Sequence, residues 1–135
     1  MLKGTTVYRV RYADTDQMGY LYYGHYARMY EIGRSELLRS TGVSYQQCEA
    51  DHKIMMPVLE LNCRYKLPAL YDDLLTIHTE LSDLPRRMLH FHHEIYNEKE
   101  ELLNKGEVKL FYVDMTTGKP VSCPEFLLDR FSPHY

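Results

Sequence analysis

Two aspartates stand in a short polar turn just before the longest amphipathic run of the chain. Asp14 and Asp16 are followed by Gly19, and from Tyr22 to Ser40 apolar or small side chains recur three or four residues apart. That spacing is typical of a helix with one buried face. A carboxylate placed just before a helix start lies beside backbone N–H groups that have no helical acceptor. The segment could therefore combine a catalytic base or nucleophile with donors suited to a developing oxyanion.

The residues alone also allow structural roles for this segment. Aspartate often forms turns and caps helices, and tyrosines at helical spacing, such as Tyr26, mainly pack in the core. His25, near the helix start, suits two roles equally: a partly buried imidazole bonded to the backbone, or a contact with a substrate. Glu31 has Arg28 and Arg34 three residues to either side, which favours ion pairs on the helix surface over a second catalytic carboxylate.

The period of the apolar residues predicts the elements that would hold these groups. Tyr8, Val10 and Tyr12 alternate with arginines before the aspartates, as in a half-buried strand. The helix that follows would be about 28 Å long at about 1.5 Å per residue, and Gly42 would end it. Gly33 lies on its buried stripe, where glycine costs roughly 1 kcal/mol against alanine. We expect another backbone, such as a sheet wrapped around the helix, to come close there.

The rest of the chain is predicted to be mostly strands. Ser44 to Lys53 is polar and would form a short helix or a loop, with Ser44 available as its cap. Four runs with strand-like patterns follow, separated by turn residues, and they span Leu59–Leu67, Leu75–Ser82, Leu89–Ile95 and Val108–Met115. Ser122 to Glu125 is typical of a capping box, which predicts a short final helix. Four sequential strands with short turns form an antiparallel meander, whose apolar face only the long helix could cover.

Bulk properties limit the domain organisation and the kinds of partner. The 135 residues and a hydrophobic content of 44% fit one domain, residues 1–135, with an ordinary core. The formal net charge of -3 argues against a general nucleic-acid binder. Cys48, Cys63 and Cys123 are odd in number and widely spaced, which favours a reducing cytoplasm over a disulfide framework. Without an apolar signal region or a run of about 18 apolar residues, the protein is predicted to be soluble, with no membrane partner.

Three histidines offer a separate hypothesis. His90 and His92 lie two apart in a predicted strand and share a face, and His78 could lie on the neighbouring strand. Three imidazoles on one face could bind zinc. Their face also carries Glu80 and Glu94, as expected of a solvated or interface surface. No metal site and no cofactor are therefore predicted.

One longer pattern joins the residues before and within the helix. The residues that carry it are Asp14-Thr15-Asp16-x-x-Gly19-x-x-x-Tyr23-x-His25-Tyr26, with Glu31 and Arg34 downstream. This pattern resembles the signature of the hotdog-fold thioesterases of the 4-hydroxybenzoyl-CoA thioesterase and YbgC-like group, and the likeness covers nearly the whole chain in length and element order. It implies an α+β hotdog fold, a curved antiparallel sheet wrapped around one long central helix. It also implies an acyl thioesterase that hydrolyses an acyl-CoA or acyl carrier protein thioester to free acid and thiol.

The resemblance also implies roles for individual residues. Asp16, the second aspartate of the pattern, would be the general base or nucleophile, and the backbone N–H at Tyr23 would polarise the thioester carbonyl. His25 stands where the family commonly has Asn and would contact the thioester. Arg86 and Arg87 are similar to the arginines that hold coenzyme A phosphates in the 4-hydroxybenzoyl-CoA branch. The substrate-binding residues predicted on this basis are Gly19, Tyr26, Arg86 and Arg87.

Two other functions would use the same site for an acyl thioester. A hotdog hydratase or dehydratase acting on acyl thioesters would need a histidine paired with the carboxylate, so it depends on whether His25 faces Asp16. A non-catalytic acyl-thioester binding module would use the same pocket without hydrolysis. Assembly is predicted as well, because a sheet around one helix leaves unpaired strand edges and Val108–Met115 is apolar on both faces. We expect a homodimer, or a homotetramer of two stacked dimers.

Overall fold

The computed structural model describes the whole chain, residues 1–135, and contains seven strands and three α-helices. The strands are β1 (Leu2–Arg9), β2 (Ile54–Met55), β3 (Val58–Tyr65), β4 (Leu74–Leu81), β5 (Met88–Tyr96), β6 (Leu102–Asp114) and β7 (Pro120–Val121). The helices are α1 (Tyr26–Ser40), α2 (Tyr45–His52) and α3 (Glu125–Phe131), with short 3-10 turns at Tyr12–Asp14, Tyr23–His25 and Ser132–His134. None of the helices has both the length and the apolar composition needed to span a membrane.

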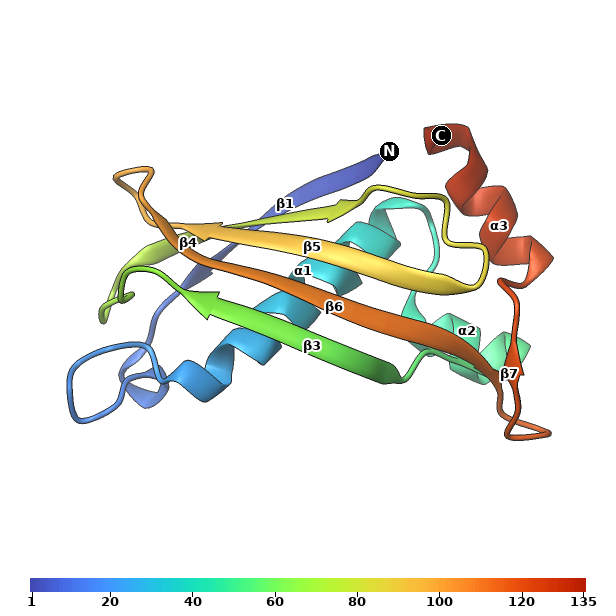
Figure 1. The fold of residues 1–135 in the computed structure, drawn as a ribbon, viewed down its shortest axis with the longest axis horizontal. Coiled ribbons are helices and arrows are strands. Elements are labelled where there is room, and N and C mark those ends of the chain that lie inside the picture. The colour runs from blue at the N-terminus through green and yellow to red at the C-terminus, as the bar shows by residue number, and fades with distance from the viewer.

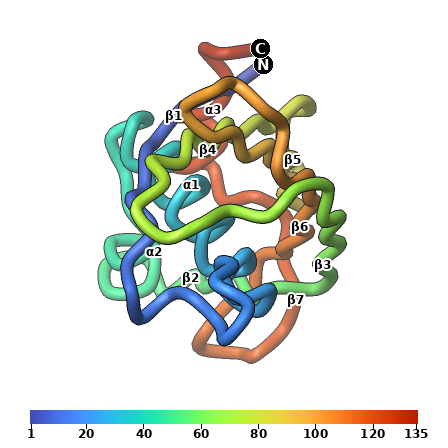
Figure 2. The backbone as a smooth tube through the Cα atoms, turned by 90° about the vertical axis from the view of Figure 1, so that its left-hand side faces the viewer, coloured from blue at the N-terminus to red at the C-terminus, as the bar shows by residue number.

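The strands form a curved sheet around α1. All strand pairs are antiparallel. In the main sheet the strands lie in the order β1, β4, β5, β6, β3, and the short strands β2 and β7 pair with the C-terminal end of β6. Figure 1 shows α1 crossing behind the sheet, and in the turned view of Figure 2 the strands curve around the helix. The predicted α+β arrangement, a curved antiparallel sheet around one long helix, is confirmed.

The central helix has the features predicted from its sequence. A 3-10 turn at Tyr23–His25 leads into α1, and Gly42 follows its end with a φ of 90°, the left-handed conformation that favours glycine. Gly33 is buried against β4. A Cβ atom on Gly33 would lie 3.0 Å from the Cγ2 atom of Ile77 and closer still to the hydroxyl of Thr79. The sheet therefore packs closely on the helix at Gly33, but through side chains of β4 and β5 and not through a backbone as predicted.

The prediction of a four-strand meander is wrong for its first member. Only β4, β5 and β6 follow one another as neighbours, whereas β3 pairs with β6, from Val58 opposite Leu110 to Tyr65 opposite Asn104. The place beside β4 is taken by β1, with Leu2 opposite Leu81. Alternation along a strand determines which face is buried, but it does not specify which strand lies alongside. The consequence is that β3 forms an edge of the main sheet.

The start of β6 and the cap of α3 also differ from the prediction. β6 begins at Leu102 rather than Val108, and the buried Asn104 breaks the apolar alternation that would have indicated the earlier start. Ser44 caps α2 as expected and accepts a hydrogen bond from the Gln47 N–H. Ser122 does not cap α3, because Pro124 occupies the N-cap position and makes no side-chain cap bond. The predicted final helix is present, but its capping box is wrong.

Polar groups are buried within the core between α1 and the sheet. The ring of His93 stacks on Tyr30 with 4.6 Å between ring centroids, and its Nδ1 atom lies 3.1 Å from the hydroxyl oxygen of Thr79. Tyr30 donates to the side-chain oxygen of Asn104, and the amide of Asn104 lies 3.2 Å from the sulfur of Cys63. These contacts connect the central helix with four strands of the sheet, β3, β4, β5 and β6.

Candidate active site

Asp16 organises the turn between the first two 3-10 segments. Its Oδ1 atom accepts hydrogen bonds from the backbone N–H groups of Met18 (2.9 Å) and Tyr20 (3.2 Å). Gly19 lies inside this turn with a φ of 83° and donates its N–H to the Asp16 carbonyl. The other carboxylate oxygen, Oδ2, has no hydrogen-bond partner among the residues of the chain. The turn therefore fixes the Asp16 side chain by one oxygen and leaves the second available.

Asp14 has a different environment, although it is only two residues away. Its side chain is 4% exposed and accepts from the Tyr8 hydroxyl (2.7 Å), the Arg11 N–H (2.9 Å) and the Arg28 guanidinium (2.5 Å). Burial raises the pKa of the Asp14 carboxyl, but the bonds from Arg11, Tyr8 and Arg28 outweigh it and lower the pKa below the ordinary value. Asp14 thus anchors the turn, one of the structural roles that aspartate commonly has.

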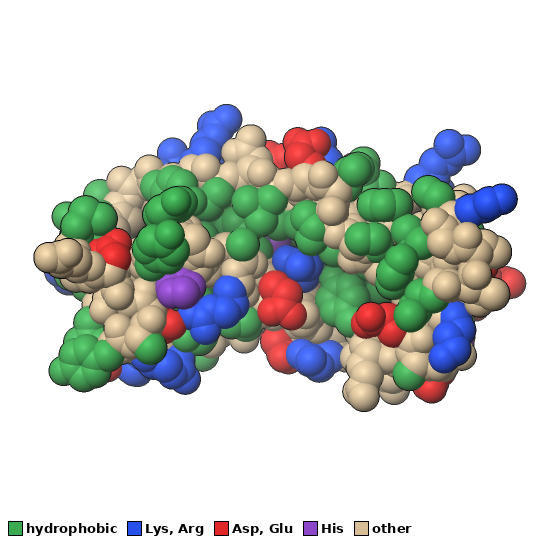
Figure 3. Space-filling model, turned by 90° about the horizontal axis from the view of Figure 1, so that it is seen from below, with side chains coloured by type: hydrophobic (Ala, Val, Ile, Leu, Met, Phe, Trp, Pro, Cys, Tyr) green, Lys and Arg blue, Asp and Glu red, His purple; other side chains and the backbone are tan.

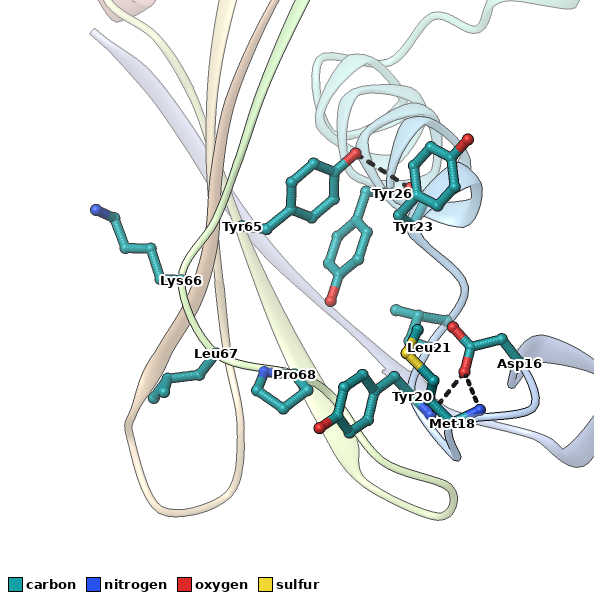
Figure 4. A pocket seen from close by; sticks show the side chains of 10 residues that line it. All are labelled: Asp16, Met18, Tyr20, Leu21, Tyr23, Tyr26, Tyr65, Lys66, Leu67 and Pro68. Carbon is teal, nitrogen blue, oxygen red and sulfur yellow. Dashed lines mark hydrogen bonds between the residues drawn. The ribbon is translucent and has the colours of Figure 1, made fainter.

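A cavity of about 280 Å³ lies beside the Asp16 turn. Three parts of the chain form its walls: the turn itself, the start of the central helix, and the end of β3 with the segment that follows (Figure 4). The lining residues are Asp16, Met18, Tyr20, Leu21, Tyr23, Tyr26, Tyr65, Lys66, Leu67 and Pro68. Most of them are apolar or aromatic, so the cavity suits the hydrocarbon part of a ligand.

Asp16 is the acidic side chain of this cavity, and no histidine, serine or cysteine lines it. Burial, with a smaller contribution from nearby Cys63, raises the pKa of Tyr26 to about 12, so its hydroxyl stays neutral at physiological pH. The Tyr65 hydroxyl donates to the Tyr23 carbonyl over 3.3 Å, which joins the end of β3 to the helix start. General base or nucleophilic chemistry in this cavity therefore depends on the Asp16 carboxylate.

The helix start supplies donors next to that carboxylate. Tyr23 lines the cavity and is the first residue of the 3-10 turn that precedes α1. The first N–H groups of a helical segment have no acceptor within it, and neither Tyr23 nor Gly24 donates a backbone hydrogen bond to the loops around them. This end of the helix also carries the positive end of its dipole. A carbonyl oxygen at the mouth of the cavity could accept from these groups.

The structure brings together some of the predicted site residues and places others elsewhere. Asp16, Tyr23 and Tyr26 line one cavity, and Gly19 shapes the turn beside it. His25 is not in the lining: its ring packs edge-on against Tyr22, with 5.5 Å between centroids. Its contact with a thioester stays a prediction.

Arg86 and Arg87 are exposed in the connection between β4 and β5. Within one chain this connection lies at the opposite end of the sheet from the Asp16 turn, as Figure 1 shows. Their predicted role in binding substrate therefore needs a second chain, or a ligand that reaches along the whole molecule.

The cavity opens beside an edge strand that exposes apolar side chains. Leu59, Leu61 and Tyr65 of β3 are 60%, 42% and 54% exposed. Figure 3 views the molecule from below the orientation of Figure 1, in which β3 lies along the lower edge of the main sheet, and hydrophobic side chains extend across this face. Tyr65 belongs both to this edge and to the cavity lining. Tyr65 and Leu67 were not predicted as site residues from the sequence, because only the pairing of β3 with β6 brings them to the helix start.

Comparison with known proteins places this geometry in context. A family model described as the thioesterase-like superfamily matches residues 10–131. The chain is 35% identical over 123 residues to the acyl-CoA thioester hydrolase YbgC of Escherichia coli, covering 91% of each protein. It is 34% identical to the putative acyl-CoA thioesterase YneP of Bacillus subtilis, covering 83% of this chain and 80% of that protein.

A solved structure shows the same similarity in three dimensions. The crystal structure of DHNA-CoA thioesterase from Staphylococcus aureus is 34% identical and superimposes with a TM-score of 0.85, covering 99% of this chain and 86% of that one. The similarity to this solved structure therefore extends over almost the whole chain.

Proposed function

The chain belongs to the thioesterase-like superfamily and has the hotdog fold, and on this basis we propose that it is an acyl-CoA thioesterase with Asp16 as its catalytic carboxylate. The observation that supports Asp16 most strongly is its position. It is the acidic side chain of an otherwise largely apolar cavity, and that cavity also contains the helix start with its free N–H groups. Binding of an acyl group against the apolar wall would bring its thioester to the carboxylate.

The chemistry follows from these parts. The acyl chain would fill the apolar part of the cavity, and the thioester carbonyl would accept a hydrogen bond from the Tyr23 N–H. As the carbonyl carbon becomes tetrahedral, negative charge develops on its oxygen, and a preorganised donor stabilises that charge better than it stabilises the substrate. Loss of one such donor typically costs about a hundredfold in rate or more.

Asp16 can act in either of two ways. As a general base, its carboxylate takes a proton from water, the resulting hydroxide adds to the carbonyl carbon, the C–S bond breaks, and the thiolate takes up a proton. As a nucleophile, its Oδ2 atom adds to the carbonyl carbon and expels the thiolate, and water then hydrolyses the mixed anhydride. Both routes give the free acid and the thiol. The bonds from Met18 and Tyr20 to Oδ1 hold the carboxylate and leave Oδ2 free in either case.

A second copy of the chain would complete the site. Pairing of two β3 edges around a twofold axis would place the Val58 end of one strand beside the Tyr65 end of the other. Val58 lies opposite Leu110 of β6, which lies opposite Leu89 near the start of β5. Arg86 and Arg87 of the partner subunit would thereby move toward the Asp16 cavity, where they could bind the phosphates of coenzyme A. The homodimer also covers the exposed apolar residues of β3.

The carrier and the compartment are the remaining parts of the proposal. Coenzyme A is the thioester carrier favoured by the curated relatives, and an acyl carrier protein is the second candidate. All three cysteines are free, in agreement with the reducing cytoplasm expected from their number and spacing.

A thiol-release assay tests this proposal. Purified protein and acyl-CoA substrates of increasing chain length are incubated, and the released thiol and the acid product are both measured. The Asp16→Asn variant is expected to lose activity by about a hundredfold or more, and the control Asp51→Asn, an exposed aspartate on α2, is expected to retain it. A hydrated or dehydrated acyl-CoA product without thiol release would support the alternative hotdog hydratase or dehydratase. Binding of acyl-CoA without any product would support a binding module.

A further inference from the structure

A cluster of metal-ligating side chains lies on the outer face of the sheet, away from α1. The side chains of β5 alternate, so Phe91 and His93 are buried while His90 and His92 are directed outward. Glu107 of β6 lies directly opposite His92 in the antiparallel register. Two imidazoles from one strand and one carboxylate from its neighbour therefore converge on one point of the surface.

The distances within the cluster suit a shared ligand. The candidate ligand atoms of His90, His92 and Glu107 all lie within 4.8 Å of one another, and the Nε2 atom of His90 is 2.9 Å from the Oε2 atom of Glu107. Zinc binds such atoms at about 2.0–2.2 Å in a tetrahedron, so its ligand atoms lie roughly 3.4 Å apart. Small side-chain rotations would bring the three groups from the observed spacing to that one.

The surrounding charges are compatible with a cation. Lys109, opposite His90 in the register, directs its ammonium group to Glu60, with 3.5 Å between Nζ and Oε2. Glu80 lies opposite His92 on the other side, in β4. The cluster thus has a second carboxylate beside it, and the lysine opposite His90 is paired with β3. Lys105, two residues before Glu107, is the other cation of this face and lines a hollow together with His92 and Glu80.

His78 shares this face but is not part of the cluster. Its Nδ1 atom lies 3.1 Å from the hydroxyl of Thr5, and its ring packs edge-on against Tyr96. The set that the structure brings together is therefore two histidines and a glutamate, in place of the three histidines considered from the sequence. Side chains of this kind are favoured ligands of zinc and neighbouring transition metals.

We propose that His90, His92 and Glu107 form a binding site for Zn²⁺ or a similar divalent transition metal. The three ligands occupy one side of the ion, and the fourth position faces solvent, because the cluster is only partly buried. The bound ion would join β5 to β6 on the outer face of the sheet. This site is separate from the Asp16 cavity, which is lined by the turn, the helix start and the end of β3, so the proposal does not depend on the proposed function.

The experiment is a titration of chelator-treated, full-length protein with Zn²⁺ by calorimetry, with Co²⁺ absorption spectra as a second readout. We expect one saturable site per chain, and His92→Ala and Glu107→Gln should each weaken it by at least about tenfold. His78→Ala is the matched control and should bind as the wild type does. The circular dichroism spectrum and thiol-release activity of His92→Ala should both be unchanged, since His92 lies outside the catalytic cavity.

Several outcomes would overturn the proposal. One is the absence of saturable Zn²⁺ binding to the folded protein. Another is equal weakening by His78→Ala and His92→Ala, which would indicate diffuse binding over the sheet face. The third is binding that survives His92→Ala but disappears in Cys63→Ser, because the ion would then be held by a thiol.

Discussion

Replacement of Asp14 by asparagine should lower the stability of the fold without directly affecting catalysis. The buried carboxylate accepts from Tyr8, Arg11 and Arg28. The asparagine amide in its place would keep one acceptor oxygen and would turn an NH₂ group toward donors that need an acceptor. One lost charge-assisted bond costs about 1.5–3 kcal/mol. The ion pair adds only about 1 kcal/mol, because the Arg28 side chain is 43% exposed and screened by solvent.

The expected total is a loss of about 3 kcal/mol in the free energy of unfolding, or roughly 10 °C in Tm. Asp16→Asn is the matched control, because the asparagine side chain retains an oxygen at the Oδ1 position for the Met18 and Tyr20 N–H groups. Its stability should stay within about 0.5 kcal/mol of the wild type. Denaturant unfolding of both variants at pH 7 measures the two values.

The pH dependence gives a second check on Asp14. Because its folded pKa is lowered, the carboxylate stabilises the protein above the unfolded pKa of about 3.9, and this contribution is lost as the pH falls through the folded pKa. The difference in the free energy of unfolding between wild type and Asp14→Asn should therefore become smaller at acid pH. Unchanged stability of Asp14→Asn, or equal destabilisation by Asp16→Asn, would refute the assignment of anchoring to Asp14 and catalysis to Asp16.

Three further predictions concern the carrier, the assembly and the buried histidine. Replacing both Arg86 and Arg87 by alanine should raise the KM for acyl-CoA more than it lowers kcat, as measured by steady-state kinetics at low salt. Unchanged KM and kcat would contradict this prediction. Leu61→Asp should convert the proposed dimer to a monomer of much lower activity in light scattering and activity dilution series, whereas Val7→Asp, on the exposed β1 edge, should not. A fully active monomer would exclude the shared site. Burial, with smaller contributions from Arg34 and His92, lowers the pKa of His93 to about 3. Between about pH 6.5 and 3 the unfolded chain therefore binds a proton that the folded chain does not. In this range the free energy of unfolding falls with decreasing pH by about 1.4 kcal/mol per pH unit. In His93→Phe, the free energy of unfolding measured with denaturant should fall with decreasing pH less steeply by that amount. An equal pH dependence in wild type and variant would mean that His93 titrates normally in the folded state.

Local features of the fold were predictable because they depend on neighbours in sequence. The periodicity after Tyr22 identified α1, Ser44 identified the start of α2, and Gly33 identified the helix face that the sheet approaches. Each of these signals comes from a few residues that contact each other or one common surface. Sheet order has no such signal, and the sequence therefore did not reveal that β3 pairs with β6.

The same distinction explains what was predictable about the candidate site. Asp16 and Tyr23 belong to one continuous segment, so a motif could identify them. Tyr65 and Leu67 come from the other side of the cavity, and they reach it only because β3 lies at the edge of the sheet. A meander with β3 beside β4 would have placed these residues elsewhere and left the helix start without its apolar wall.

The position of β3 therefore connects the assembly of the protein with its chemistry. The strand that walls the cavity is also the strand whose outer edge is unpaired and whose apolar residues are exposed. A second copy that covers this edge would also close the cavity and exclude water from the thioester, which strengthens the interactions of Asp16 and the helix N–H groups. A monomer would keep both groups but in a more open site. Dissociation of the proposed dimer should accordingly lower kcat even at saturating acyl-CoA, in addition to removing the partner arginines proposed to bind the carrier.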